Sequence, residues 1–478
     1  MAAQESVTVL VVGAGPCGLV AGITLARYGV DVLVIEQRDG GSSLSRALVI
    51  STRCMELMRR FGLEERVRAG AADVESTALV ARVLASSDGV VMPLGYPSDD
   101  EAARVSPTRP AWAPQSHHEP LLLARLQSAP SASVRFGAEL LALEPAGDRV
   151  RATVIDRATG DLRQIDARYV IGADGAHSVV RREMAIAMQG PDDLDVYERL
   201  EFRASLDDAV AARRHALYVL KHPDVDGSVL ARRGRQDRWG LSRERPSDRP
   251  GMDTLSGSEL VAMIRTATGV GDLDVTIERL NSFTFAAQIA ERYRRDRTFL
   301  IGDAAHRMTP RGGTGMNTGI QDAFDVGWKL AWVLHGWAPA RLLDTYEDER
   351  RPIALHNVGR AGSPGGARRT TNEALPWDLD NRIAHCWLDT AGGRVSTIDL
   401  IGDGLTLFTA HDVAHWAGPI GNIGLAAPVN VATLPPRTAA ALGLEPAGAV
   451  LVRPDGHEVA RWVAPDTTPR PGPAWLAP

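Results

Sequence analysis

Three glycines near the start of the chain have the spacing that phosphate binding requires. They lie in the run Gly13-Ala14-Gly15-Pro16-Cys17-Gly18, and Glu36 ends the next apolar segment. In such a run the first glycine permits a tight turn, the second lets the backbone approach a pyrophosphate, and the third lets a helix pack closely on a strand. The N–H groups at the start of that helix attract phosphate, and a carboxylate such as that of Glu36 accepts hydrogen bonds from ribose hydroxyls. The pattern predicts a dinucleotide site, for either FAD or NAD.

A second glycine-rich segment favours FAD. An apolar strand at 299–301 leads into Gly302-Asp303, and the run Gly312-Gly-Thr-Gly-Met-Asn317 precedes a helix that we expect from Thr318 to His335. Asp303 can hydrogen-bond a polyhydroxylated chain such as the ribityl of a flavin. The start of a helix stabilises the negative charge of reduced flavin near N1 and O2. The number of glycines favours this interpretation over a helix start without a ligand. We therefore expect the two glycine-lined helix starts and Asp303 to hold one flavin between them.

A third segment, Gly172-Ala-Asp174-Gly175, follows another apolar strand at 169–171. Ser178 and Arg181 come one turn later. Asp174 has two interpretations that the sequence leaves open: it caps the start of a short helix, or it contributes to the dinucleotide site.

The elements around these segments predict an α/β fold. Apolar, β-branched strands at 7–12 and 32–35 enclose a helix at 19–27, which makes one βαβ unit. Alternating apolar residues between 134 and 155 indicate a smaller antiparallel meander.

Length and composition limit the class of protein. The chain has 478 residues, which is too long for one core, so two or three domains are expected. Its net charge of -6 disfavours binding to nucleic acid or to an anionic membrane. No basic, cleavable leader and no apolar run of membrane-spanning length is present, and the 3 cysteines include no CxxC pair. These features predict a cytoplasmic protein without a structural metal. They leave the oligomeric state open, a homodimer included.

The three segments together resemble the motifs of the single-component (class A) FAD-dependent aromatic hydroxylases, the family of para-hydroxybenzoate and phenol hydroxylases. The resemblance covers about residues 5–360 and is strongest to the aromatic polyketide hydroxylases. The tail, with 400–407 and 448–456 as matching pieces, resembles the thioredoxin-like C-terminal domain of phenol and polyketide hydroxylases, without its CxxC. The resemblance implies a Rossmann-like FAD-binding domain at 1–180 and 285–365, a sheet-and-helix substrate domain at 181–284, which 76–110 can extend, and a thioredoxin-like domain at 395–478.

The resemblance also implies roles for single residues. Arg46 would lie beside the flavin and help catalysis electrostatically, although a surface ion pair is the alternative. Gln115 would contact the ribityl or pyrophosphate, Leu140 the adenine, and Asp174 with Gly175 both FAD and NAD(P)H. The full set expected to bind FAD is Gly13, Ala14, Gly15, Pro16, Cys17, Gly18, Glu36, Gln37, Arg38, Arg46, Gln115, Leu140, Asp174, Gly175, Asp303, Pro310, Gly313, Gly315, Met316 and Asn317.

The implied activity is a monooxygenase reaction on an aromatic or polyketide-like small molecule. FAD would take electrons from NADPH or NADH and react with O₂ through a C4a-hydroperoxide, which the protein must keep dry. Epoxidation or Baeyer–Villiger insertion on the same fold stays open, and so does a non-catalytic flavin-binding or drug-sequestering protein. The sequence does not identify a catalytic base: His118, Tyr218 and His222 are candidates. His118 and Arg311 stand where the family often has apolar and small residues, respectively.

Overall fold

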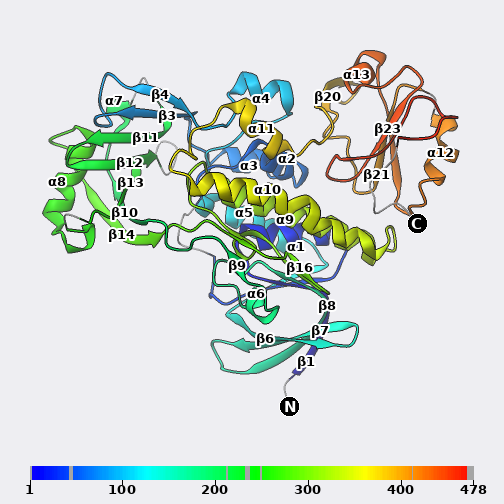
Figure 1. The fold of residues 1–478 in the computed structure, drawn as a ribbon, viewed down its shortest axis with the longest axis horizontal. Coiled ribbons are helices and arrows are strands. Elements are labelled where there is room, and N and C mark those ends of the chain that lie inside the picture. Colours follow the sequence, from blue (N-terminus) through cyan, green and yellow to red (C-terminus); the bar gives the residue numbers. More distant parts are fainter. Residues whose placement is uncertain are drawn as a thin grey trace.

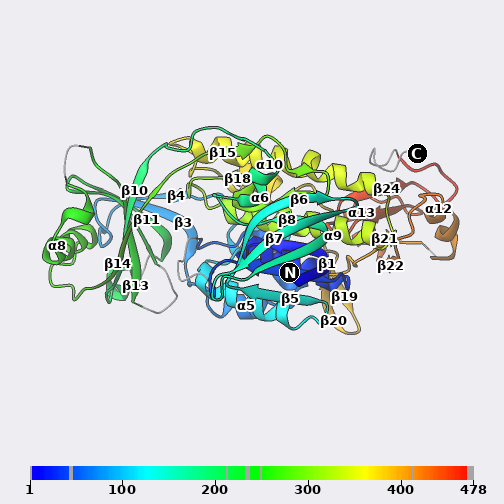
Figure 2. The same cartoon turned by 90° about the horizontal axis from the view of Figure 1, so that it is seen from below.

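The chain forms three sheet-containing parts in a row (Figure 1). The computed structural model describes residues 3–41, 47–210, 214–231, 237–247, 250–411 and 413–470. A large parallel sheet with its helices lies in the middle, a second sheet lies at one end, and the C-terminal sheet lies at the other (Figures 1 and 2).

The central sheet has the order β16-β17-β8-β1-β2-β5. Its strands β5, β2, β1, β8 and β17 run parallel, and β16 pairs antiparallel at the edge. Two further strands, β6 and β7, extend β8 as an antiparallel meander. This confirms the predicted parallel α/β fold. The bounds are β1 (Ala3–Val12), β2 (Val32–Glu36), β5 (Ala132–Phe136), β6 (Ala138–Ala146), β7 (Arg149–Asp156), β8 (Leu162–Gly172), β16 (Arg294–Arg295) and β17 (Thr298–Leu300).

Helices cover the central sheet, so strands such as β2 are buried along their whole length, as expected for a parallel sheet with both faces covered. Helix α1 begins at Pro16, three residues before the prediction, and α9 begins at Gly315. Residues expected in the two glycine turns therefore form the first turns of these helices. The helical elements are α1 (Pro16–Arg27), α2 (Thr52–Arg60), α3 (Glu64–Arg68), α5 (Gln115–Gln127), α6 (Val179–Glu183), η2 (Gly302–Ala304), α9 (Gly315–Leu334), η3 (Ala340–Asp344) and α10 (Thr345–Gly362).

Helices α1 and α9 pack closely side by side and run in the same direction. A Cβ on Gly319, early in α9, would lie 2.6 Å from the Cys17 sulfur, early in α1. A Cβ on Gly327, two turns later in α9, would lie 2.8 Å from the Cβ of Thr24, two turns later in α1. Because both contacts advance along the two helices together, the N-termini of α1 and α9 lie at the same end of the pair.

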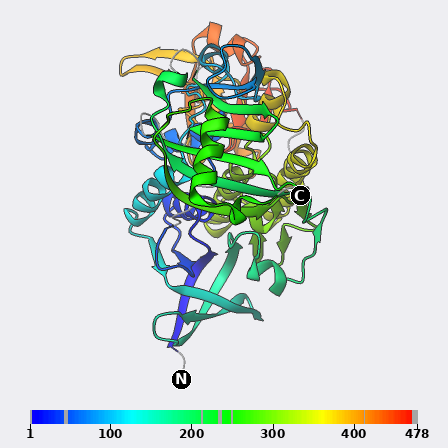
Figure 3. The same ribbon diagram turned by 90° about the vertical axis from the view of Figure 1, so that its left-hand side faces the viewer.

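The second sheet has the order β14-β10-β13-β12-β11-β3-β4, in which only β11 and β3 pair in parallel. Helix α8 packs on the face turned away from the central sheet, and we call the opposite face the inner face (Figures 2 and 3). A small sheet, β18-β15-β9, connects the two large sheets. The bounds are β3 (Glu75–Ala81), β4 (Val90–Pro93), α4 (Asp99–Val105), β9 (Met188–Gln189), β10 (Val196–Arg203), α7 (Asp207–Val210), β11 (His215–His222), β12 (Val225–Ala231), β13 (Arg238–Glu244), η1 (Met252–Thr254), α8 (Gly257–Thr268), β14 (Thr276–Thr284), β15 (Gln288–Ala290) and β18 (His306–Arg307).

The C-terminal part has a sheet of order β22-β21-β23-β24, in which one parallel pair adjoins antiparallel strands, as in a thioredoxin-like fold. The predicted strand at 450–452 lies in β23. No helix within the described ranges is both long and apolar enough to cross a membrane. The bounds are α11 (Thr371–Leu379), β19 (Trp387–Thr390), β20 (Gly393–Ser396), β21 (Leu405–Thr409), η4 (Val413–Trp416), α12 (Ala417–Gly421), β22 (Val429–Thr433), α13 (Pro436–Ala441), β23 (Ala449–Val452) and β24 (Glu458–Trp462).

Candidate functional site

The glycines at the start of α1 play two different parts. Gly13 has a φ of +107°, and a Cβ there would collide with the carbonyl of Ala173 at the end of β8. Gly18 likewise packs against the backbone of Gly13. In contrast, a Cβ on Gly15 would meet no protein atom within 4 Å. The protein itself therefore does not require a glycine at position 15, whereas a phosphate approaching the backbone would.

Glu36 lies beside this turn at the end of β2. Its carboxylate accepts hydrogen bonds from the Ala14 N–H at 3.0 Å and from the Arg38 side chain at 2.8 Å. Burial alone would raise the pKa of Glu36, but the hydrogen bonds from Arg38 and Ala14 lower it overall. The group stays an anion and can accept further hydrogen bonds, while Gln37 and Arg38 are exposed at the rim.

The loop before α9 is held in place by contacts from the side chains of Tyr96 and Asn317. The Tyr96 hydroxyl lies 3.0 Å from the carbonyl oxygens of both Gly312 and Gly313. The Asn317 amide donates to the carbonyl of Gly313 at 2.9 Å and to that of Val49 at 3.1 Å. No side chain caps the first N–H groups of α9, so these donors face the loop without a partner from a capping residue.

The packing of α1 on α9 brings the two glycine segments together. Helix α1 also lacks a side-chain cap, and its N-cap residue is Gly15. Two N-termini at one end of a helix pair add their partial positive charges, which favours an anionic ligand. Asp303 is exposed and follows Gly302, where an added Cβ would lie 2.9 Å from the Cys17 sulfur in the first turn of α1. Asp303 therefore lies close to the start of α1, as the prediction of one shared ligand requires.

Asp174 is engaged in the structure of its own segment. Its carboxylate accepts hydrogen bonds from the Ser178 hydroxyl at 2.5 Å and from the Val180 N–H at 3.0 Å. Burial raises its pKa, against these hydrogen bonds. Arg181 of α6 then donates to the carbonyl of Ala304, next to Asp303. The N-cap residue of α6 is Ser178, whose hydroxyl accepts from the Arg181 N–H, and Asp174 supports this cap from the preceding turn. A dinucleotide contact stays a prediction for Asp174 and for Gly175.

The other expected residues lie around the same end of the sheet, with one exception. Arg46 lies outside the described residues, and so does its expected role. The Gln115 N–H donates to the carbonyl of Ala47 at 2.9 Å, directly after that segment. Leu140 is buried in β6, close after Gly137, whose N–H donates to the carbonyl of Arg38. Pro310 is exposed, and Gly315 and Met316 are half-buried in the first turn of α9.

The three candidate bases differ in their surroundings. His118 is fully buried in α5, and burial lowers its pKa to about 4. Tyr218 packs in the apolar cluster on the α8 side of the second sheet, away from the loop of Gly313. His222 lies at the end of β11, where its ring accepts from the Asp224 N–H at 3.2 Å. None of them contacts the glycine loops through an interaction described for these residues.

Sequence reasoning did not detect two features near the flavin loop. Tyr96 has no motif around it, and its partners are more than two hundred residues away in the chain. Arg311, noted only as unusual, forms an ion pair with Asp195 at 2.7 Å and lies 5.2 Å above the Phe285 ring. The stacked pair Tyr197–Phe285, with centroids 4.0 Å apart, continues this contact onto the second sheet.

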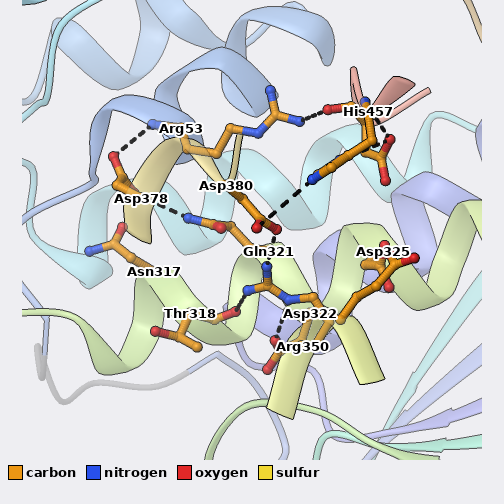
Figure 4. A network of polar contacts seen from close by, with 12 residues as sticks. Arg53, Asn317, Thr318, Gln321, Asp322, Asp325, Arg350, Asp378, Asp380 and His457 are labelled. Carbon is orange, nitrogen blue, oxygen red and sulfur yellow. Dashed lines mark hydrogen bonds and ion pairs between the residues drawn. The ribbon is translucent and has the colours of Figure 1, made fainter. Parts of the chain in front are cut away.

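A buried polar network runs from the start of α9 into the C-terminal part (Figure 4). Arg350 of α10 donates to Asp322 at 3.0 Å, to Asp380 at 3.1 Å and to the carbonyl of Thr318 at 3.5 Å. His457 lies 3.8 Å from Asp380. Because buried charges must be paired to be tolerated, these contacts couple the position of α9 to that of the C-terminal sheet.

Three carboxylates of the same network, those of Asp325, Glu349 and Asp455, lie within 4.8 Å of one another. Lys329 contacts Asp325 and Glu349 at 2.7 and 2.8 Å, and Arg453 contacts Glu349 and Asp455 at 2.8 and 2.7 Å. His457 lies 3.3 Å from Asp455, and its pKa is raised to about 9, so three cations balance the three carboxylates of this ion-pair network.

The comparison with protein families decides what this site is. Residues 6–361 match the family model described as an FAD binding domain, and 379–474 match the aromatic-ring hydroxylase C-terminal model. The chain belongs to the FAD-dependent aromatic hydroxylase family. The site fits FAD in this family, because Gly15 leaves open space for the pyrophosphate and two uncapped helix starts meet where its anionic groups would lie.

Relatives of this hydroxylase-family chain align over almost its whole length. The tetracenomycin B2 monooxygenase-dioxygenase of Streptomyces olivaceus is 32% identical over 94% of each chain. The aklavinone 12-hydroxylase RdmE of Streptomyces purpurascens is 34% identical over 95% of each chain. Among solved structures, a ternary complex of aklavinone-11 hydroxylase with FAD and aklavinone has a TM-score of 0.83, 30% identity, and coverage of 97% of this chain and 96% of its own.

Proposed function

We propose that this protein is an FAD-dependent monooxygenase that uses NAD(P)H and O₂ to hydroxylate an aromatic polyketide. The observation that carries the proposal is the joint N-terminal end of α1 and α9, together with the near-complete alignment to polyketide hydroxylases. Gly13 to Gly18, Glu36 and Asp303 would hold the dinucleotide and ribityl, and the loop at Gly313 to Asn317 would hold the ring. When bound, FAD supplies the electron transfer and the activation of oxygen.

The substrate would lie between this loop and the inner face of the second sheet. Side chains alternate along a strand, and Leu200, Leu241 and Leu280 pack on the α8 side, so their neighbours Arg199, Ser242 and Asn281 lie on the inner face. Two cross-strand pairs, Arg199 with Ser242 and Arg199 with Asn281, place these three side chains together.

This polar group suits an oxygen-rich aromatic substrate. The Arg199 guanidinium donates to the Ser242 hydroxyl at 3.1 Å and lies 5.2 Å above the Phe283 ring. The Asn281 Oδ1 is buried and has no hydrogen-bond partner among the described residues, so a substrate hydroxyl can satisfy it. A phenolate oxygen would pair with the guanidinium, while the rings Tyr197 and Phe283 supply aromatic contact.

The test is turnover by the purified, FAD-loaded protein with polycyclic phenols. We expect NADPH or NADH oxidation that rises on adding substrate and a product 16 daltons heavier, whose position of oxygen separates hydroxylation from epoxidation and Baeyer–Villiger insertion. Arg199→Met should raise the KM for the phenol at least tenfold, with basal NAD(P)H oxidation unchanged. Arg203→Met, on the same strand but exposed, is the control. Ligand binding without stimulated NAD(P)H oxidation or product would instead indicate a sequestering protein.

A further inference from the structure

A small polar cavity lies behind the loop at Gly312 to Thr314, against the first turns of α9. Its volume is about 20 Å³, enough for one or two water molecules or one ion of similar size. Its lining includes Tyr96, Thr314, Asn317, Asn357, Arg369 and Asp378. Tyr96 and Asn317 also hold the flavin loop, so whatever occupies the cavity contacts the support of that loop.

Two guanidinium groups adjoin this cavity without a carboxylate partner. Arg369 lines it and is 9% exposed. Arg360 donates to the Thr314 hydroxyl at 3.2 Å, and Thr314 is also part of the lining. In both arginines the buried Nε has no hydrogen-bond partner. Within the described ranges neither side chain has an ion pair of 4 Å or less, and Arg360 donates instead to the carbonyl of Gly366.

The positive charge around the cavity exceeds the negative charge. Burial and the neighbouring Arg369 lower the pKa of Arg360 to about 10, yet an arginine stays protonated at neutral pH. The buried carboxylate beside the cavity is Asp378, whose oxygens already accept from Gln321 Nε2 at 3.1 Å and from the Arg53 N–H at 3.2 Å. The carboxylate of Glu373 also interacts with Arg369, but it is exposed to solvent, which screens its charge. Burial raises the pKa of Asp378, so it offsets at most one of the two cations.

We propose that this cavity is a binding site for a small monovalent inorganic anion of the size of chloride, held by Arg369 and screening Arg360. An anion between two uncompensated guanidinium groups removes their mutual repulsion in a region of low dielectric constant. A phosphate or an organic carboxylate is too large for the space.

The direct test is crystallography of the FAD-loaded protein with sodium bromide as the only halide source. Bromide gives an anomalous signal, and we expect a peak in the cavity within ~3.5 Å of the Arg369 guanidinium, the range of charge-assisted contacts to a large anion. Ordered water or an empty cavity at that position would overturn the proposal. This result does not depend on turnover, so it is separate from the outcome for the proposed function.

A solution test uses the melting temperature at constant ionic strength, with chloride replacing gluconate, which does not fit the cavity. Binding to the folded state alone raises the melting temperature progressively with chloride. We expect this rise in the wild type and in Arg368→Met, whose side chain is exposed next in sequence. It should be lost in Arg369→Met and partly kept in Arg369→Lys. An equal rise in Arg369→Met would refute the site, and if that variant does not fold, the bromide crystals decide.

Discussion

Replacing Gly15 by valine separates the needs of the fold from the needs of FAD. Gly15 has a φ of -73° and a ψ of 177°, which valine adopts readily, and its Cβ would meet no protein atom within 4 Å. The free energy of unfolding of the apoprotein should therefore fall by no more than about 0.5 kcal/mol. A rise of up to about 1 kcal/mol is also consistent with an open position, because the unfolded chain loses conformational freedom.

FAD binding should respond very differently. The valine side chain would occupy the space through which a pyrophosphate reaches the N–H groups of α1. Losing two hydrogen bonds to a charged group, at about 1.5–3 kcal/mol each, weakens binding by about 3–6 kcal/mol, or roughly 10²–10⁴-fold in Kd. A substitution at Gly13 or Gly18 would also destabilise the fold, because these glycines pack tightly against the backbone. Gly15→Val avoids this second effect on FAD affinity.

The assay is titration of apoprotein with FAD, followed by quenching of flavin fluorescence, beside urea unfolding of the apoprotein. Gly257→Val is the matched control, because a Cβ on Gly257 at the start of α8 also meets no atom within 4 Å. Wild-type affinity for FAD in Gly15→Val would refute the placement of the pyrophosphate at α1. A large loss of stability without FAD would refute the claim that the position is open.

Three further outcomes follow from the contacts around the site. Tyr96→Phe should lower the free energy of unfolding by about 0.5–1.5 kcal/mol, because the hydroxyl contact with the carbonyl of Gly313 is lost; an unchanged urea midpoint would contradict it. Arg350→Met should cost about 3–5 kcal/mol, since buried carboxylates lose their partner, as a denaturant titration would show. Burial lowers the pKa of His457, but the charge of Asp455 outweighs burial and raises this pKa to about 9. Protonated His457 therefore stabilises the folded state fully below about pH 6.5, and this contribution is lost as the pH rises through 9. The unfolding free energy of His457→Gln should lack this decline relative to wild type.

The central sheet could be predicted because its signals are local. The apolar strand at 7–12, the glycine turn and Glu36 follow one another within a single βαβ unit, and the structure has each of them in place. The predicted starts of α1 and α9 lie three residues too late. Pro16 and Gly315 are accepted in a first helical turn, because the N–H groups there need no partner within the helix.

The supports of the site could not be predicted because they come from distant segments. Tyr96 lies far from Gly313 in the chain, and Arg311 lies far from Asp195, so these pairs meet only in the folded structure. Neither residue has neighbours of a recognisable pattern. The same holds for Arg199, which becomes informative only when the register of β10 with β13 and β14 places it beside Ser242 and Asn281.

The C-terminal part has no CxxC pair, so its resemblance to thioredoxin implies no thiol redox role. The contacts of this region indicate a structural role. Asp380 and His457 reach Arg350, and Arg350 reaches the carbonyl of Thr318 in the second turn of α9. Asn317, the adjacent residue, holds the flavin loop. A loop that must shield a reactive flavin from water needs support from behind, and a buried ionic network that tolerates few geometries supplies it. We therefore expect the C-terminal part to affect the reaction only through the position of α9, which these contacts fix.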